Sequence, residues 1–277
     1  MVRSPILKTG SIDMSRVLRL RFFLTMGLLA GSGLTAEFVQ ADDASAKLTP
    51  QVVAAADKAE TAEFEATIAE CDALLATPAA QKNAAARAAA TEQRGNAHLQ
   101  LGHIAEALAD FDAAIKLEPR RGPGHWQRGI ACYYAGQFDA GAKQFEAYQT
   151  VDAADVENVT WRYLCMAKAD GLDKARAELL PVGPDRRIPM HEVYELFAGR
   201  ATPDDVLAAA RAGNPTDSEL RTRLFYAHLY LGLWYEAGGD AKQSLAHIRQ
   251  AAVDYALPGY MHAVARVHLA LRSRDAK

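Results

Sequence analysis

The chain has little cysteine and no recognisable catalytic or phosphate-binding motif. Only three cysteines occur among 277 residues, and Cys132 and Cys165 fall within apolar patterns of helical period. We expect buried thiols, with a disulfide or an intermolecular bond as the alternative. A G-x-S-x-G elbow and a P-loop are both absent, and no cysteine stands next to a plausible base. These absences argue against an enzyme.

Metal-binding motifs are missing as well. His191-Glu192 begins H-E-x-x-H, but the second histidine is replaced by Glu195. His98 and His103 are five residues apart and would point to different sides of a helix. The sequence therefore predicts no metal site and no cofactor.

The first 41 residues have the pattern of a secretory signal peptide. Met14 is the expected start, because residues 1–13 show no clear pattern and a basic region follows. Its basic residues are Arg16, Arg19 and Arg21. The uncharged apolar run over residues 22–36 is short for a membrane span. Cleavage is expected after Ala41, with Ala36 as the alternative.

An exported, periplasmic or otherwise extracytoplasmic chain follows from this pattern. No cysteine stands at the cleavage point, so we predict no lipid anchor and no stable membrane span. Residues 1–41 hold five of the 31 Lys and Arg and two of the 34 Asp and Glu, so their removal leaves a net charge of about −6. A mildly acidic chain argues against nucleic acid and anionic membranes as partners.

A sequence unit with a period of 34 residues occurs twice. The first copy reads RGNAHLQLGHIAEALADFDAAIKLEP over residues 94–119, and the second reads RGIACYYAGQFDAGAKQFEAYQTVDA over residues 128–153. Identical residues stand 34 apart in four pairs, namely Arg94 and Arg128, Gly95 and Gly129, Gly102 and Gly136, and Phe111 and Phe145. This period and spacing are the signature of the tetratricopeptide repeat (TPR), a pair of antiparallel helices.

Each repeated position has a physical reason. Gly95 and Gly129 would let the first helix of a pair approach its partner closely, and Gly102 would suit a left-handed turn between the helices. Phe111 would face inward from the second helix. For Arg94 and its repeat equivalent we favour a structural role, with the stem between helices and the head on a carboxylate, over anion binding.

Helical patterns continue on both sides of the two repeats, and nothing reads as strand. We expect a helix over residues 51–76, a degenerate pair over 161–180, a loop over 182–189, short helices over 191–197 and 202–213, a further repeat over 220–256, and a final helix over 260–271 that covers the open end of the stack. The predicted fold is all-α: a TPR superhelix of antiparallel helix pairs, with N-terminal helices and a C-terminal capping helix.

This pattern divides the chain into five parts. They are a signal peptide (1–41), a lead-in with N-terminal helices (42–86), two TPR repeats (87–155), a degenerate repeat and helical connector (156–217), and a C-terminal TPR with its capping helix (218–277).

The order of these units resembles the new lipoprotein I family of Gram-negative bacteria. RGIACYYAG, the Trp-containing degenerate pair, VYELFAGRATPDDVLAAAR and FYAHLYLGLWYEAGGD carry the resemblance, over roughly residues 64–271. It implies a periplasmic TPR adaptor that forms dimers, presents peptidoglycan endopeptidases to a tail-specific protease and scaffolds cell-wall hydrolases. This chain departs from the family by lacking a lipidation cysteine, and it has one clear TPR fewer before His125.

First helices line the concave face of a TPR stack, so the register predicts a protein-binding surface rich in aromatics. Its residues are Glu92, Asn96, Trp126, Ile130, Tyr133, Tyr134, Trp161, Lys168, Tyr226, Leu233 and Glu236. The alternative is that half of these aromatics belong to the core.

We predict an exported scaffold or adaptor that binds protein or peptide clients, such as cell-wall hydrolases or a protease. The alternatives are a self-associating module of the envelope, with a homodimer compatible with both, and a wall-active enzyme or glycan binder, for which no paired carboxylates can be read from the sequence.

Overall fold

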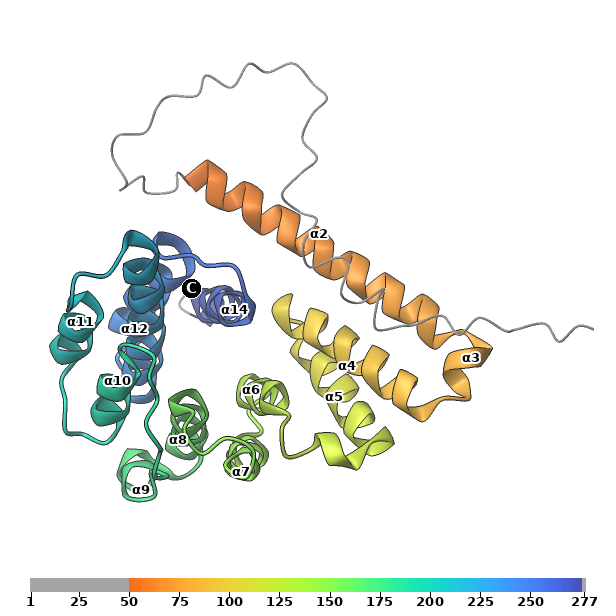
Figure 1. Cartoon of the computed structure of the whole chain (residues 1–277), viewed down its shortest axis with the longest axis horizontal. Coiled ribbons are helices and arrows are strands. Elements are labelled where there is room, and N and C mark those ends of the chain that lie inside the picture. The colour runs from red at the N-terminus through yellow and green to blue at the C-terminus, as the bar shows by residue number, and fades with distance from the viewer. Residues whose placement is uncertain (1–49, 276–277) are drawn as a thin grey trace, which may run out of the picture. The chain divides into compact units, whose positions relative to one another are not determined.

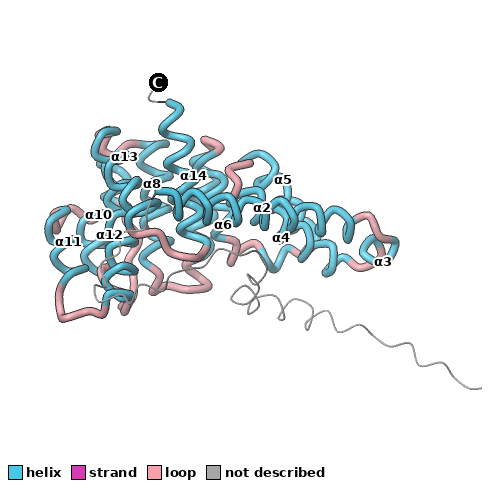
Figure 2. Tube along the Cα trace, turned by 90° about the horizontal axis from the view of Figure 1, so that it is seen from above, coloured by secondary structure: helices cyan, strands magenta, loops and turns pink. Residues whose placement is uncertain are grey.

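The described part of the chain is helical throughout. The computed structural model describes residues 50–275, all within one compact unit. The predicted signal peptide (1–41) and residues 42–49 of the lead-in lie outside the described residues. Between residues 50 and 275 helices alternate with turns and loops, and no strand occurs (Figure 2). The all-α prediction is confirmed.

Most helices follow one another as pairs joined by short turns. Their bounds are α2 (Pro50–Leu75), α3 (Pro78–Gln81), α4 (Ala84–Gln100), α5 (Ile104–Leu117), the 3-10 turn η1 (Pro119–Arg121), α6 (Trp126–Tyr134), α7 (Phe138–Tyr148), α8 (Val156–Asp170), α9 (Leu172–Ala177), α10 (Met190–Phe197), α11 (Pro203–Arg211), α12 (Asp217–Ala237), α13 (Ala241–Arg249), the π-helical turn η2 (Gln250–Asp254) and α14 (Tyr260–Asp275). The two 34-residue copies form α4–α5 and α6–α7, and the third and last pairs are α8–α9 and α12–α13.

The repeated glycines set the distance within each pair. A Cβ added at Gly129 would lie 2.5 Å from the ring of Phe145, and one at Gly95 would lie 2.8 Å from Phe111. Gly232 has the same relation to Ile248, at 2.6 Å. Any larger residue would push the two helices apart, because cores have no spare volume. The 16-residue spacing thus marks a real contact in three pairs.

The repeated arginines have the structural role that we favoured. Arg94 donates from Nε and Nη2 to the carboxylate of Asp110, at 2.8 and 2.7 Å, and it also pairs with Asp72 of α2. Arg128 donates from Nε to Asp112 at 2.6 Å. Arg94 thus joins the two helices of its own pair, α4 and α5. Arg128 of α6 instead reaches back to α5 of the preceding pair, and its Nη1 also donates to Gln144 of α7 at 3.4 Å. No anion is needed to satisfy these guanidinium groups.

The final helix, α14, packs on α13 and η2 of the last pair as expected, and it also extends over the inner side of the stack. It lies among the first helices of the pairs, and Figure 1 shows it end-on between α12, α6 and α2. Its contacts reach the turn after α4, where Val267 is nearest to the Cβ position of Gly102, and α6, where Tyr260 meets Trp126 edge-on with ring centroids 4.8 Å apart. Ala263, Val264 and His268 are almost fully buried. A helix with buried residues on several sides must have other helices packed against those sides, but sequence periodicity does not identify these neighbours.

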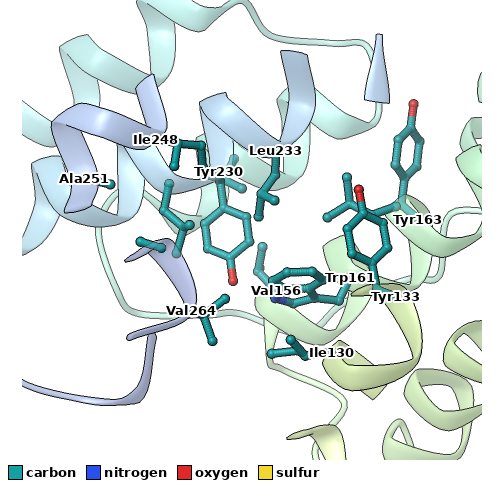
Figure 3. Close-up of a cluster of buried hydrophobic side chains, with 14 of the residues drawn as sticks. Ile130, Tyr133, Val156, Trp161, Tyr163, Tyr230, Leu233, Ile248, Ala251 and Val264 are labelled. Carbon is teal, nitrogen blue, oxygen red and sulfur yellow. The ribbon is translucent and has the colours of Figure 1, made fainter. Parts of the chain in front are cut away.

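The core runs through the middle of this arrangement. Figure 3 shows Tyr133 and Trp161 from α6 and α8 converging with Tyr230 and Leu233 of α12. Trp161, Tyr133 and Tyr230 are among the largest fully buried side chains. The three cysteines are free and buried, as expected.

Candidate protein-binding groove

Four of the eleven predicted binding residues are core residues. Ile130, Tyr133, Trp161 and Leu233 have exposed fractions of 2% or less. The register placed them correctly on the inner side of the stack, but α14 and the neighbouring helices cover them. The prediction that they form an open aromatic surface is therefore wrong, and the alternative, that half of the aromatics are core, describes Tyr133 and Trp161 better.

Glu236 gathers a second part of the predicted set around one carboxylate. It accepts hydrogen bonds from the Tyr133 hydroxyl at 2.9 Å and from Arg272 Nε at 2.6 Å, and Lys168 Nζ lies 4.0 Å away. Burial alone would raise the pKa of Glu236, but His268, Arg272 and Lys168 hold that pKa below its ordinary value. Two of these partners, His268 and Arg272, belong to α14.

Regularly spaced residues of α14 make its contacts with the repeats. The Tyr260 hydroxyl donates to Asn96 Oδ1 at 3.1 Å, and His268 Nδ1 lies 3.2 Å from the Tyr134 hydroxyl. Tyr260, His268 and Arg272 are separated by eight and four residues, which places them on one side of a helix. The inner face of the repeats therefore holds a helix of the chain itself.

One cavity on this face is left open beside α14. It has a volume of about 180 Å³ and lies between α6, α7, α8 and the first turn of α14. Its lining residues are Trp126, Ile130, Phe145, Asp155, Glu157, Asn158, Trp161 and Met261. Trp126, Asp155, Glu157 and Met261 are only half-buried, so the cavity opens to solvent. Three of the eleven predicted residues, Trp126, Ile130 and Trp161, meet here.

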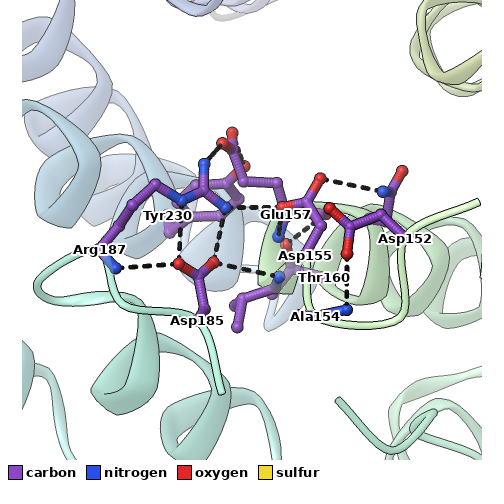
Figure 4. Close-up of polar contacts among 10 residues, drawn as sticks. Asp152, Ala154, Asp155, Glu157, Thr160, Asp185, Arg187 and Tyr230 are labelled. Carbon is purple, nitrogen blue, oxygen red and sulfur yellow. Dashed lines mark hydrogen bonds and ion pairs between the residues drawn. The ribbon is translucent and has the colours of Figure 1, made fainter. Parts of the chain in front are cut away.

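Acidic residues border this cavity where α8 begins. Asp155 caps α8 and accepts the backbone N–H of Glu157 at 3.1 Å, which suits a carboxylate at a helix N-terminus. The 181–189 loop folds back over this end, where the Gly183 N–H donates to the Ala153 carbonyl at 2.8 Å. The loop thereby brings Asp185 and Arg187 to the cluster (Figure 4).

Arg187 binds three carboxylates at once. Its Nη2 donates to Asp155 at 2.7 Å and to Asp185 at 2.6 Å, and its Nη1 pairs with Glu157. The Tyr230 hydroxyl donates to the other oxygen of Glu157 at 2.6 Å. Burial raises the pKa values of Asp155 and Glu157, and Arg187 opposes the rise without reversing it. One guanidinium thus faces three acids.

Sequence reasoning missed this acidic cluster. Its members come from the N-terminal end of α8, from the loop that we treated as a connector, and from α12, and the bonded residues Glu157 and Tyr230 are 73 positions apart. The two acids at residues 155 and 157 in front of a helical pattern were a signal for a helix start, but nothing in the sequence paired them with Arg187 or Tyr230.

Two further predicted residues, Glu92 and Tyr226, belong neither to the hydrogen-bond partners of Glu236 nor to the lining of the cavity. Glu92 pairs with Arg121 at 2.5 Å, within the first repeat. Tyr226 packs edge-on against Phe225, and both burial and the Glu157 charge raise its pKa, to about 12. Lys168, which lies beside Glu236, is the one exposed member of the set. The eleven predicted residues therefore do not form one continuous surface.

Residues 50–275 hold neither a helix that could span a membrane nor a cluster of metal ligands. No helix in this part of the chain combines the length and the apolar character that crossing a bilayer requires. No three His, Cys, Asp or Glu side chains in it converge as metal ligands would.

Comparison with known protein families supports the repeat assignment. Residues 88–121 match the tetratricopeptide repeat family. The matched segment comprises most of α4, all of α5 and the turn η1, the pair in which Gly95 meets Phe111. TPR units mediate contacts between proteins, so the match supports a protein–protein interaction scaffold.

Proposed function

We propose that this chain is an exported, non-enzymatic TPR scaffold that binds protein or peptide clients on the inner face of its repeats. The clients would be envelope proteins such as cell-wall hydrolases or a protease, in keeping with the resemblance to the new lipoprotein I family. The basic and apolar pattern of residues 1–41 supports export.

The observation that carries the proposal is the placement of α14. The inner face already holds a helix through hydrogen bonds and aromatic contacts from α4, α6 and α12. Asn96, Tyr134 and Glu236 supply them, and all three were predicted as binding residues. A face that binds one helical segment in this way has the chemistry to bind a peptide.

The acidic cluster fits binding better than acid–base catalysis. Arg187 and Tyr230 already bind oxygens of Glu157, and Arg187 also holds Asp155 and Asp185. A general acid or base needs an oxygen within reach of the substrate proton. We therefore assign this cluster to recognition.

Client capture by matched tryptophan variants tests the function. Trp126 lies half-buried at the open cavity, whereas Trp234 is a half-buried tryptophan outside the predicted set. Trp126→Ala should lower the yield of cross-linked clients from the exported fraction about tenfold or more, because buried aromatics dominate binding hot spots at roughly 2 kcal/mol each. Trp234→Ala should leave the yield unchanged.

Melting temperatures of the same variants separate binding from folding. Tyr133→Ala should unfold easily, because emptying a fully buried aromatic site costs roughly 3–5 kcal/mol. Trp126→Ala should melt close to the unaltered chain. Equal capture by Trp126→Ala and the unaltered chain would exclude the inner face as the client site.

A further inference from the structure

We propose that the open cavity between Trp126, Trp161, Asp155 and Glu157 binds the basic side chain of a peptide, arginine or lysine, with the adjoining backbone carbonyl on Trp161 Nε1. The inference rests on the proposed client-binding function, since it names what that face would recognise.

Charge is the first reason. Asp155, Glu157 and Asp185 share the single guanidinium of Arg187, and Asp152 borders the same end of α8. Arg186 is exposed to solvent beside them. Four acids against two arginines leave a local excess of two negative charges. A further cation in the cavity would lie beside Asp155 and Glu157, where partial burial strengthens the attraction.

The aromatic walls are the second reason. Trp126, Phe145 and Trp161 line the cavity from three helices. A cation within about 6 Å of an aromatic face is attracted by the ring, and tryptophan is the strongest of these rings. Tryptophan faces next to carboxylates are the surroundings that ammonium and guanidinium groups prefer in proteins.

The indole of Trp161 is the third reason, and it is independent of the acids. Trp161 is 2% exposed, yet its Nε1 has no hydrogen-bond partner in the described part of the chain. Figure 3 shows this nitrogen on the side of the ring toward Ile130, which also lines the cavity. A buried donor without an acceptor costs free energy, so a ligand acceptor here would stabilise the site. A peptide carbonyl next to a basic side chain supplies that acceptor.

Size sets the limit of the ligand. A volume of about 180 Å³ accepts one long side chain but not a folded segment. Because α14 closes one side through Met261, the peptide would enter between Trp126 and Asp155, and its carbonyl must follow the side chain inward to reach the buried Trp161 Nε1. The cavity would therefore recognise a single residue of a client.

A pair of small probes tests the inference on the full chain. N-acetyl-arginine methylamide carries the cation and the carbonyl, and the citrulline analogue has the same shape without charge. In two-dimensional NMR spectra of the three tryptophan indole N–H groups, the arginine probe should shift Trp126 and Trp161 at millimolar concentration. Trp234 lies outside the cavity and should not shift. The citrulline probe should bind at least tenfold more weakly, and the lysine probe should resemble arginine.

Conservative variants assign the effect to named atoms. Asp155→Asn with Glu157→Gln keeps the cap and the Tyr230 contact but removes charge, so affinity for the arginine probe should fall about tenfold or more. Asp139→Asn, at an exposed acid of α7 outside the cavity and the acidic cluster, is the matched control and should bind normally. If the double variant fails to fold, Trp161→Phe still tests the donor, with an expected loss of about threefold to tenfold.

Three results would overturn the inference: equal binding of the citrulline probe, shifts confined to Trp234, or no binding at millimolar concentration. The outcome is separable from that of the proposed function. Client capture that persists while the probes fail would refute the cavity and leave the scaffold standing. Probe binding without client capture would do the reverse.

Discussion

At the scale of single residues, the glycine of each first helix decides whether a pair can form. Gly129→Ala places a methyl group 2.5 Å from the Phe145 ring, so we expect a loss of roughly 1–3 kcal/mol from overpacking. At about 2–4 °C per kcal/mol for a chain of this size, the melting temperature should fall by several degrees in calorimetry.

A second substitution checks the cause. Phe145→Leu in the Gly129→Ala background removes ring atoms from the contact and should recover part of the lost stability. Additive losses in the double variant would show that the glycine acts through something other than the Phe145 ring.

The thiols give a second prediction at this scale. Burial raises the pKa of Cys71 to about 11 and also raises the pKa values of Cys132 and Cys165. At pH 8 all three should stay protonated and react slowly with a thiol reagent such as DTNB, since the thiolate is the nucleophile. Unfolding in guanidinium should release three reactive thiols. Release of only one would reveal a disulfide.

At the scale of helices, Glu236 holds the second half of α14 in place. Glu236→Gln removes the charge that Arg272 and Lys168 meet, and bonds to a charged group contribute about 1.5–3 kcal/mol. Amide hydrogen exchange across α14 should therefore speed up about tenfold or more, while α5 stays protected. Glu106→Gln, on an exposed position of α5, is the control. Unchanged exchange in α14 would mean that apolar burial alone holds this helix.

The packing of helices that are far apart in the chain is what the sequence did not predict. The Gly95–Phe111 and Gly129–Phe145 relations repeat within 16 residues, so a single sequence displays them. The position of α14 depends on pairs such as Tyr260 and Asn96, which are 164 residues apart and follow no period. For the same reason Tyr133 looked like a groove residue, since its register is correct and only the distant α14 and α12 bury it.

At the scale of the whole molecule, acid should destabilise the fold through a histidine pair that joins α12 and α13, with His228 buried and His247 half-buried. His228 is 3% exposed, and its Nδ1 lies 2.8 Å from that of His247. Burial, then His247 and Arg211, lower the pKa of His228 to about 4, and burial lowers the pKa of His247. The two charged groups that act on His228, namely His247 and Arg211, both disfavour a proton on it.

The sign of the pH effect follows from these directions. In the unfolded chain His228 titrates near pH 6.5, so between about pH 6.5 and 4 the unfolded state binds a proton that the folded state does not. The stability due to neutral His228 is fully present above pH 6.5 and is lost as the pH falls toward 4. At pH 5 the loss is about 2 kcal/mol, because each pH unit in this window corresponds to about 1.4 kcal/mol.

Comparing variants isolates this contribution from the other titrating groups. Between pH 7.5 and 5 the unaltered chain should lose several degrees more in melting temperature than His228→Gln, which cannot take up the proton at this position. His191→Gln, at an exposed position, should behave like the unaltered chain. An equal acid-induced fall in the His228→Gln variant would place the acid sensitivity elsewhere, and the Asp155–Glu157 cluster would not explain it, since carboxyl pKa values raised on folding stabilise the folded state as the pH falls.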